Sequence, residues 1–271
     1  VQSAREAARR AAALDPELTS PWAALIRFGL GSGSYLSGET SLARKQFEEA
    51  LELAGAEQPL LRMVILSFLS IVASDQGHLE EAAILAREAR TLVDSFGLRG
   101  VPQSSWAPIA LGYMLAKRGN LAEAQTELES SVSARRIPPD LSPWLTLIGL
   151  LALARVRSAR GNREGAREAL AEARVILEAQ PDAGIFPNLL ERQERRLRAR
   201  KPRDGSRNGE LTEREFEVLE LLDSDLSTRQ MAASLYVATS TVRTQVKSIY
   251  RKLGVSSREE AVEEAHAREL L

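Results

Sequence analysis

Four glycines in a regular register constrain the fold of this 271-residue chain more than any other feature. They lie 39, 42 and 42 residues apart, at positions 38, 77, 119 and 161. An alanine follows each glycine by five residues and a leucine precedes it by eight, so the register extends beyond the glycine itself. A pattern held four times at this period predicts a tandem array of similar helical units.

Each period predicts a hairpin of two helices. We expect the first helices near 21–37, 59–76, 102–118 and 141–160, and the second near 39–54, 78–96, 120–135 and 162–179. Proline near the start of the first helices suits an opening turn. Small residues beside the register leucines, at 31, 70, 112 and 154, would let the two helices of a hairpin approach closely.

The Leu-small, Gly-x4-Ala-x3-large-x2-small pattern resembles the tetratricopeptide repeat, with a period longer than the usual value of about 34 residues. The resemblance implies a right-handed superhelix with a concave groove lined by the first helices. Segment 3–16 looks like the second half of one more hairpin, and 187–201 like a basic helix that closes the stack. Because one hairpin is cut in half, we expect the chain to be the C-terminal part of a longer protein.

Several aromatic residues lie on the predicted first helices. Core packing is the expected role for them, and contact with a ligand in the groove is the alternative. These residues are Trp22, Tyr35, Trp106, Tyr113 and Trp144.

The segment 239–253 predicts a helix with two contrasting faces. Val242, Val246, Ile249 and Leu253 fall on one apolar face, and cations at 243, 247 and 251 form a separate stripe. Five basic residues and no acidic one occur between 239 and 258. A lone basic helix is usually a solvated surface, but a recognition helix also needs one packing face and one cationic face. The flanking sequence favours the second interpretation.

Three possible capping boxes surround this helix, at Thr212/Glu215, Ser227/Gln230 and Ser257/Glu260. They predict four short helices within 211–271, with a short connection between the second and third that is typical of a helix-turn-helix. The sequence LTEREFEVLELL, LSTRQMAASLYV, TSTVRTQVKSIYRKLGV, SSREEAVEEA resembles the LuxR-type (GerE-like) DNA-binding domain. It departs from the common pattern at three positions, which are Met231, Ala238 and Gln245.

The resemblance implies that the third helix docks in the major groove of double-stranded DNA. The residues expected to face bases are Arg243, Thr244 and Lys247. The residues expected to hold phosphates are Thr228, Thr239, Ser240, Thr241 and Arg251. The resemblance also implies dimerisation through the helix 258–268, for which Ala261, Val262 and Ala265 offer a modest apolar strip.

Charge and composition divide the chain into three parts. We expect an all-α protein with repeats over 1–200, a linker over 201–209 and a helix-turn-helix domain over 210–271. Segment 192–209 carries eight basic and two acidic residues, which could either contact phosphate or keep the linker solvated. The overall net charge of −1 argues against a general nucleic-acid coat.

Other functional classes find little support. The chain has no cysteine, its two histidines have no ligand partner at metal-binding spacing, and no phosphate-binding loop or nucleophile motif occurs. We therefore expect no enzyme activity, no cofactor, no bound metal and no membrane association, and we expect a cytoplasmic location.

The order of repeats and C-terminal domain resembles large MalT-like regulators, in which an ATP-binding domain precedes the repeats. The resemblance implies transcriptional regulation, with the repeats binding a small-molecule inducer or a protein partner. The alternative is a repeat scaffold whose C-terminal helical domain binds protein rather than DNA.

Overall fold

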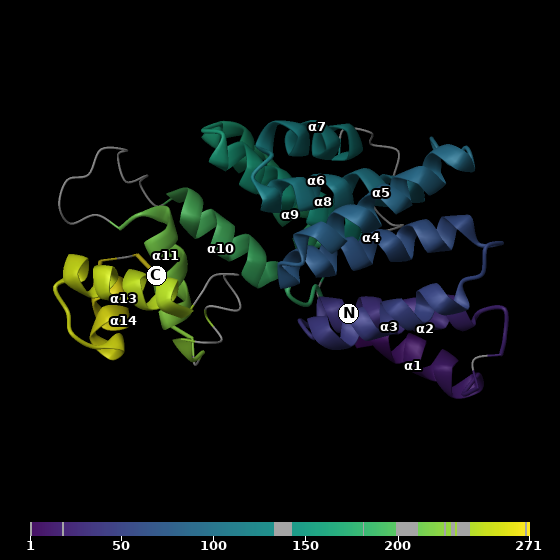
Figure 1. The fold of residues 1–271 in the computed structure, drawn as a ribbon, viewed down its shortest axis with the longest axis horizontal. Coiled ribbons are helices and arrows are strands. Elements are labelled where there is room, and N and C mark those ends of the chain that lie inside the picture. The colour runs from purple at the N-terminus through teal and green to yellow at the C-terminus, as the bar shows by residue number, and fades with distance from the viewer. Residues whose placement is uncertain are drawn as a thin grey trace. The chain divides into compact units, whose positions relative to one another are not determined.

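The computed structural model describes residues 2–17, 19–132, 143–180, 182–198, 211–224, 226–228, 231, 239–268 and 270–271. Throughout these residues the regular structure is helical and no strand occurs, which confirms the all-α prediction. The chain forms two compact units, Val1–Leu197 and Arg198–Leu271, and each unit is described by itself (Figure 1).

The first unit is a stack of helical hairpins. The first helices of the hairpins are α2 (Ala23–Leu36), α4 (Pro59–Gln76), α6 (Trp106–Arg118) and α8 (Pro143–Ala159), and a short 3₁₀ turn, η1 (Pro102–Ser105), precedes α6. The second helices are α3 (Thr40–Leu53), α5 (Leu79–Ser95), α7 (Leu121–Val132) and α9 (Arg163–Glu178). The helix α1 (Gln2–Leu14) packs before the first hairpin and α10 (Phe186–Arg198) follows the last.

The register glycines end the first helices. All four adopt positive φ angles, between 80° and 88°, a conformation that side chains with a Cβ atom rarely take. The residue after each glycine donates its backbone N–H to a carbonyl five residues earlier, as in His78 to Ala73 at 2.8 Å. This is the Schellman arrangement, which satisfies carbonyls that the end of a helix leaves unpaired. The spacing of the glycines therefore reports the spacing of the hairpin turns.

Complementary residue sizes allow the two helices of each hairpin to pack. A Cβ atom built on Gly31 would lie 2.7 Å from the ring of Phe47, and one built on Gly112 would lie 2.7 Å from Leu128. At these two positions the close approach of a large facing residue leaves no room for a side chain. In the second hairpin the facing position is a small alanine, and Ser70 takes the place of glycine, with its hydroxyl donating to the Ala82 carbonyl at 2.8 Å.

The aromatic residues divide between core and surface. Trp106 and Tyr35 are buried, and Trp106 lies 4.3 Å from Phe68 between ring centroids, so the core expectation is confirmed for them. Tyr35 and Tyr113 donate their hydroxyls to Asp75 at 3.2 and 2.6 Å, which links the first helices of three hairpins. The expectation is wrong for Trp22, which precedes α2 and is 66% exposed, because it lies at the open end of the first hairpin.

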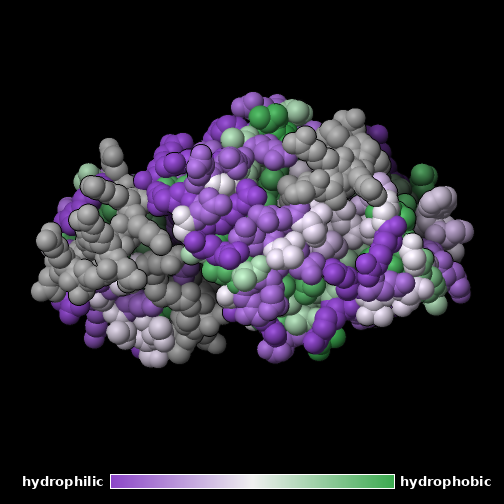
Figure 2. All heavy atoms as spheres, turned by 90° about the horizontal axis from the view of Figure 1, so that it is seen from above, coloured by the Kyte–Doolittle hydropathy of each residue, from purple (hydrophilic) through white to green (hydrophobic). Residues whose placement is uncertain are grey.

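Helix α4 is longer than the apolar run Met63–Ala73 that stands out in the sequence. By length and composition it could cross a membrane, with a mean hydropathy of 1.3 over 18 residues. However, 67% of that window is buried inside the protein, which is the position of a core helix. Figure 2 shows that the face of the repeat stack in view is mostly hydrophilic, with hydrophobic residues in small separate patches.

The second unit contains α11 (Glu213–Leu222), α13 (Thr239–Leu253) and α14 (Arg258–Ala267). Their apolar faces meet in one small core that includes Val218, Leu219, Val242, Ile249 and Leu253. Met231 is 1% exposed and belongs to the same core. Most of the expected second helix, which the Ser227/Gln230 box would open, lies outside the described residues, as do the connection 235–238 and the linker.

Candidate nucleic-acid interface

The helix α13 separates its apolar and cationic residues as the sequence predicts. Val242 and Ile249 are fully buried and Leu253 is 4% exposed, so this side packs into the core of the second unit. Arg243 and Lys247 lie exposed on another side of the helix. At about 100° of rotation per residue, positions 243, 247, 240, 251 and 244 fall in one continuous band.

The structure brings most of the predicted site residues into this exposed band. Exposed residues in the band or at its edge are Ser240, Thr241, Arg243, Thr244, Lys247 and Arg251. Thr239 is half-buried at the first position of the helix and borders the band on one side, while Thr241 borders it on the other. Thr228 is half-buried and belongs to the segment before Met231, where few neighbours are described.

Two of the five basic residues from 239 to 258 make polar contacts within the second unit. Lys252 contacts the carboxylate of Glu215 on α11 at 2.6 Å, with exposed side-chain fractions of 18% and 8% for the two partners. Arg258 donates to the carbonyl of Leu222, the last residue of α11, at 2.9 Å and to that of Leu226 at 2.8 Å. The sequence count of five cations therefore overstates the charge available to a ligand, and three remain on the exposed band.

Glu215 connects the start of α11 to α13 through Lys252. It completes a capping box with Thr212, because its carboxylate accepts from the Thr212 backbone N–H at 2.6 Å. Burial would raise the pKa of Glu215, but hydrogen bonds from Lys252, Ser248 and Thr212 outweigh it and lower the pKa to about 2. The carboxylate thus stays ionised and holds α13 against α11.

Sequence reasoning missed these internal contacts, although one signal was available. Lys252 is adjacent to Arg251 but lies about 100° further round the helix, outside the stripe of exposed cations. The Glu215 carboxylate, three residues after the predicted N-cap, is the acidic partner in the capping box.

Two of the predicted capping boxes can be compared with the structure. The box at Thr212 and Glu215 is confirmed. At the start of α14, Ser257 accepts from the Glu260 backbone N–H at 3.1 Å, as predicted. The Glu260 carboxylate, however, accepts from the Ser256 backbone and hydroxyl at 2.8 and 3.0 Å. The reciprocal half of the box is therefore shifted by one residue, and the box involving Gln230 lies outside the described residues.

The predicted apolar strip on α14 needs correction. Ala261 and Ala265 are fully buried in the core of their own unit, and Val262 is half-buried against it. They pack on α11 and α13 because the small unit needs every apolar residue for its core. The exposed side of α14 carries Glu259 and Glu263 instead, so these alanines are not free to contact a second copy.

In the repeat unit, arginines pair with carboxylates across each junction of the described hairpins. The distances are 2.5 Å for Arg44–Glu81, 2.9 Å for Arg90–Glu127, 3.0 Å for Arg157–Glu129 and 2.6 Å for Arg174–Glu194. These pairs cross between neighbouring layers and fix how one layer sits on the next. Their arginines are thus already neutralised by partners within the stack.

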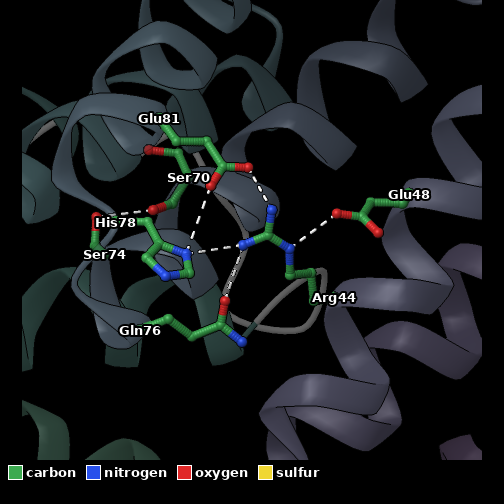
Figure 3. Close-up of polar contacts among 7 residues, drawn as sticks. All are labelled: Arg44, Glu48, Ser70, Ser74, Gln76, His78 and Glu81. Atoms are coloured by element: carbon green, nitrogen blue, oxygen red, sulfur yellow. Dashed lines mark hydrogen bonds and ion pairs between the residues drawn. The ribbon is translucent and has the colours of Figure 1, made fainter. Parts of the chain in front are cut away.

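The junction of the first two hairpins shows this most fully (Figure 3). The Arg44 guanidinium donates to Glu48, Gln76 and Glu81, at 2.9, 3.0 and 2.5 Å. It also lies 3.1 Å from Nδ1 of His78, which accepts from it when the neutral ring carries its proton on Nε2. His78, one of the two histidines without a metal-ligand partner in the sequence, is 57% exposed at its side chain and takes part in this junction.

A hollow of about 510 Å³ lies at the junction of the second and third hairpins. The ends of α5 and α7 line it together with residues 99–105. Its charged groups are paired with one another: Arg90 with Glu127 at 2.9 Å and Arg99 with Asp94 at 2.7 Å. No group of three metal-ligating side chains occurs among the described residues of either unit.

The fold and these junctions define a protein of stacked helical hairpins joined to a small helical unit. Residues 1–267 match the family described as the MalT-like TPR region, and the chain belongs to that family. The match extends from the repeats through the second unit as far as Ala267.

Proposed function

We propose that this protein is a sequence-specific DNA-binding transcriptional regulator of the LuxR type, with α13 as its recognition helix in the major groove. The exposed band of α13 carries this proposal. It presents Arg243, Lys247 and Arg251, while no acidic residue occurs in the helix and the opposite side is buried. A helix fixed on one side and cationic on the other suits contact with phosphates and base edges.

Within the band, we assign Arg243, Thr244 and Lys247 to bases. Arginine and lysine favour the acceptor atoms of guanine in the major groove. The Thr244 hydroxyl donates to the Ser240 carbonyl at 3.0 Å, so its oxygen remains an acceptor and its methyl group can contact a thymine methyl. Phosphate contacts are assigned to Arg251 and to hydroxyl-bearing residues, which are Thr228, Thr239, Ser240 and Thr241. Most of these hydroxyls lie near the start of α13, where backbone N–H groups favour an anion.

The test compares two cations of the same band. A cognate duplex is first selected from random sequence with the full chain. Lys247→Ala should then cost about 1–3 kcal/mol of binding free energy on that duplex and relax preference at one base pair. Arg251→Ala should weaken matched and mismatched duplexes equally and reduce the salt slope by about one.

Lys45→Ala is the matched control, because Lys45 is a well-exposed lysine of the repeat unit, on α3. It should change neither the affinity nor the salt slope. If Lys247→Ala behaves like Arg251→Ala, the assignment of the base-facing residues is wrong.

A steep salt dependence also separates this proposal from the alternative, a scaffold whose second unit binds protein. DNA binding by the exposed cations of α13 must weaken as salt rises, and the phosphate contact assigned to Arg251 contributes about one unit of salt slope per chain. A mostly apolar protein interface need not weaken in this way. Binding of the second unit to a protein partner with little salt dependence would favour the scaffold.

We further propose that the repeats sense an inducer or a protein partner and that the protein acts in the cytoplasm, without enzyme activity, cofactor or membrane contact. The hollow at the second junction is one place for a small ligand, although its arginines are already paired. Dimerisation on DNA through the helix 258–268 stays a prediction, and it must use residues other than Ala261 and Ala265. Isolated repeats should bind the inducer or partner. If the second unit alone bound it equally well, the proposal that the repeats are the sensor would be wrong.

A further inference from the structure

Two first helices of the stack offer little open surface for a ligand, although the repeat resemblance implies a groove lined by the first helices. Twelve consecutive residues of α4, Met63–Ser74, are buried, and so are eight consecutive residues of α8, Leu147–Ala154. Because an α-helix turns once in about 3.6 residues, runs of this length cover every side of the helix. Over these stretches α4 and α8 have no open side that could face a groove.

Segment 183–186, which follows the last hairpin, covers the ends of two first helices. The Ile185 backbone N–H donates to the Leu36 carbonyl at the end of α2, at 3.0 Å. The ring of Phe186, which is 1% exposed, stacks on Trp144 near the start of α8, with centroids 5.7 Å apart and an angle of 3° between the planes. The chain's own residues fill these places, so open space for a ligand lies elsewhere on the stack.

The hollow at the junction of the second and third hairpins provides such space. Its volume of about 510 Å³ lies within the range of about 300–1,000 Å³ that small-molecule sites occupy. Its apolar wall consists of Val93, Val101, Pro102 and Pro108, and its polar wall includes two arginines and two carboxylates. Because α5 and α7 both contribute to the lining, a ligand in the hollow would contact both hairpins.

The two ion pairs in the hollow use only part of the hydrogen-bonding capacity of their partners. Arg99 directs its Nε and one amino group to a single oxygen of Asp94, at 3.0 and 2.7 Å. Arg90 donates one N–H group to one oxygen of Glu127, at 2.9 Å. A guanidinium has five N–H donors and a carboxylate has about four lone-pair sites, so donors and acceptors of both pairs remain for a ligand.

The Arg99–Asp94 pair can rearrange around a ligand at little cost. Its partners have exposed side-chain fractions of 76% and 45%, compared with 39% and 21% for Arg90 and Glu127. Exposed pairs contribute little to stability because water and salt screen them. A ligand carboxylate can therefore accept from Arg99, and a ligand ammonium can donate to Asp94, while the deeper pair continues to join α5 to α7.

We propose that this hollow binds a small zwitterion with an apolar side chain, such as a free amino acid or a dipeptide. Its two cationic and two anionic side chains leave no net charge, so a ligand with one sign of charge meets repulsion as well as attraction. The apolar wall suits a hydrocarbon side chain. Binding should stabilise the junction of the two hairpins. The regulatory meaning of this binding rests on the proposed sensor role of the repeats.

Free leucine and leucyl-leucine are the probes, titrated into the full chain in a calorimeter. At least one of them should bind saturably, with one ligand per chain. The capped form of that probe, with its amine acetylated and its carboxylate amidated, should bind at least roughly tenfold more weakly, because hydrogen bonds between charged groups are lost. No saturable binding of either probe up to roughly 10 mM would overturn the proposal, and so would equal binding of the capped form.

Charge variants locate the bound probe. Arg99→Met should weaken binding at least roughly tenfold, since it removes the partner of the ligand carboxylate. Arg10→Met is the matched control, because Arg10 is 77% exposed and also pairs with a carboxylate, that of Glu6, but lies on α1 outside the hollow. It should leave the affinity unchanged, and equal losses in the two variants would contradict the assignment.

A second pair of variants changes the space in the hollow and leaves its charge unaltered. Ser130→Trp, on the wall formed by α7, fills part of the hollow and should abolish binding. Thr126→Trp, at an exposed position one turn earlier on α7 and outside the lining, should have no effect. Undiminished binding by the Ser130→Trp chain would place the probe elsewhere and overturn the proposal.

These titrations need no DNA, so their outcome is separate from that of the DNA-binding test. A chain that binds DNA but neither probe would refute the zwitterion site alone. A chain that binds a probe in the hollow but no DNA would refute the proposed regulator and leave the site standing.

Discussion

The repeat unit and the second unit use their cations in opposite ways. In the stack, Arg44, Arg90 and Arg157 each lie within about 3 Å of a carboxylate on a neighbouring layer. On α13, Arg243 and Lys247 make no ion pair with any described residue. The repeats have to align successive layers, and paired charges do this at little cost in burial. The face of α13 has no such task within its own unit, so its charge remains available to a ligand.

The comparison teaches that counting charges is a poor guide to function unless their partners are known. Segment 239–258 has five cations in sequence, but Lys252 and Arg258 are as fully engaged as the arginines of the stack. The difference lies in burial. The pair of Lys252 and Glu215 is the more buried one, with exposed side-chain fractions of 18% and 8%, whereas the pairs between layers are more exposed.

The largest expected effect is a difference in the stability of the second unit between substitutions of two lysines that lie five residues apart on α13. Lys252→Met leaves the buried Glu215 carboxylate without its cation and should destabilise the second unit by about 3 kcal/mol. Lys247→Met should leave stability nearly unchanged, because its side chain is exposed. All three tryptophans lie in the first unit, so unfolding of the second should be followed by hydrogen exchange in α11 and α13. Equal destabilisation by the two variants would erase the distinction between internal and exposed cations.

Acid should affect the second unit through the same carboxylate. The pKa of Glu215 falls from an ordinary value of 4.5 in the unfolded chain to about 2 in the folded one. The folded state therefore favours the ionised form, and this stability is present above pH 4.5 and lost as the pH falls towards 2. The loss should be on the order of 2–3 kcal/mol.

The matched variants for that acid titration are Glu215→Gln and Glu263→Gln. Glu215→Gln should be less stable at neutral pH and should lose little further stability between about pH 4.5 and 2. Glu263→Gln, at an exposed position on α14, should titrate like the unaltered chain. A Glu215→Gln chain with an unchanged acid response would show that the buried carboxylate does not cause it.

The smallest expected effect concerns the pairs between layers. Arg90→Met breaks the pair with Glu127, whose partners have exposed side-chain fractions of 39% and 21%. The cost should be about 0.2–1 kcal/mol and should shrink as salt screens the pair. Thermal unfolding of the repeats, followed by tryptophan fluorescence at low and high salt, measures it. A loss of stability as large as that expected for Lys252→Met would mean that the pairs between layers stabilise the protein as much as the Lys252–Glu215 pair does.

The helical hairpins and their turns could be predicted closely from the sequence. The register glycines mark helix ends because a left-handed residue at that position favours glycine whatever the surroundings. The expected range 59–76 coincides with α4, and 239–253 coincides with α13. Local signals of this kind depend on a few neighbouring residues, so they can be read without knowing the tertiary structure.

The sequence by itself thus determined the all-helical class, the period of the stack and the amphipathic character of α13, because each depends on local conformation or helical periodicity. Tertiary structure alone decided which cations of 239–258 remain exposed and that Ala261 and Ala265 belong to the core. It also decided that Ile185 meets Leu36, 149 residues away. These outcomes depend on which surfaces come together when distant helices pack, and periodicity along the chain carries no information about that choice.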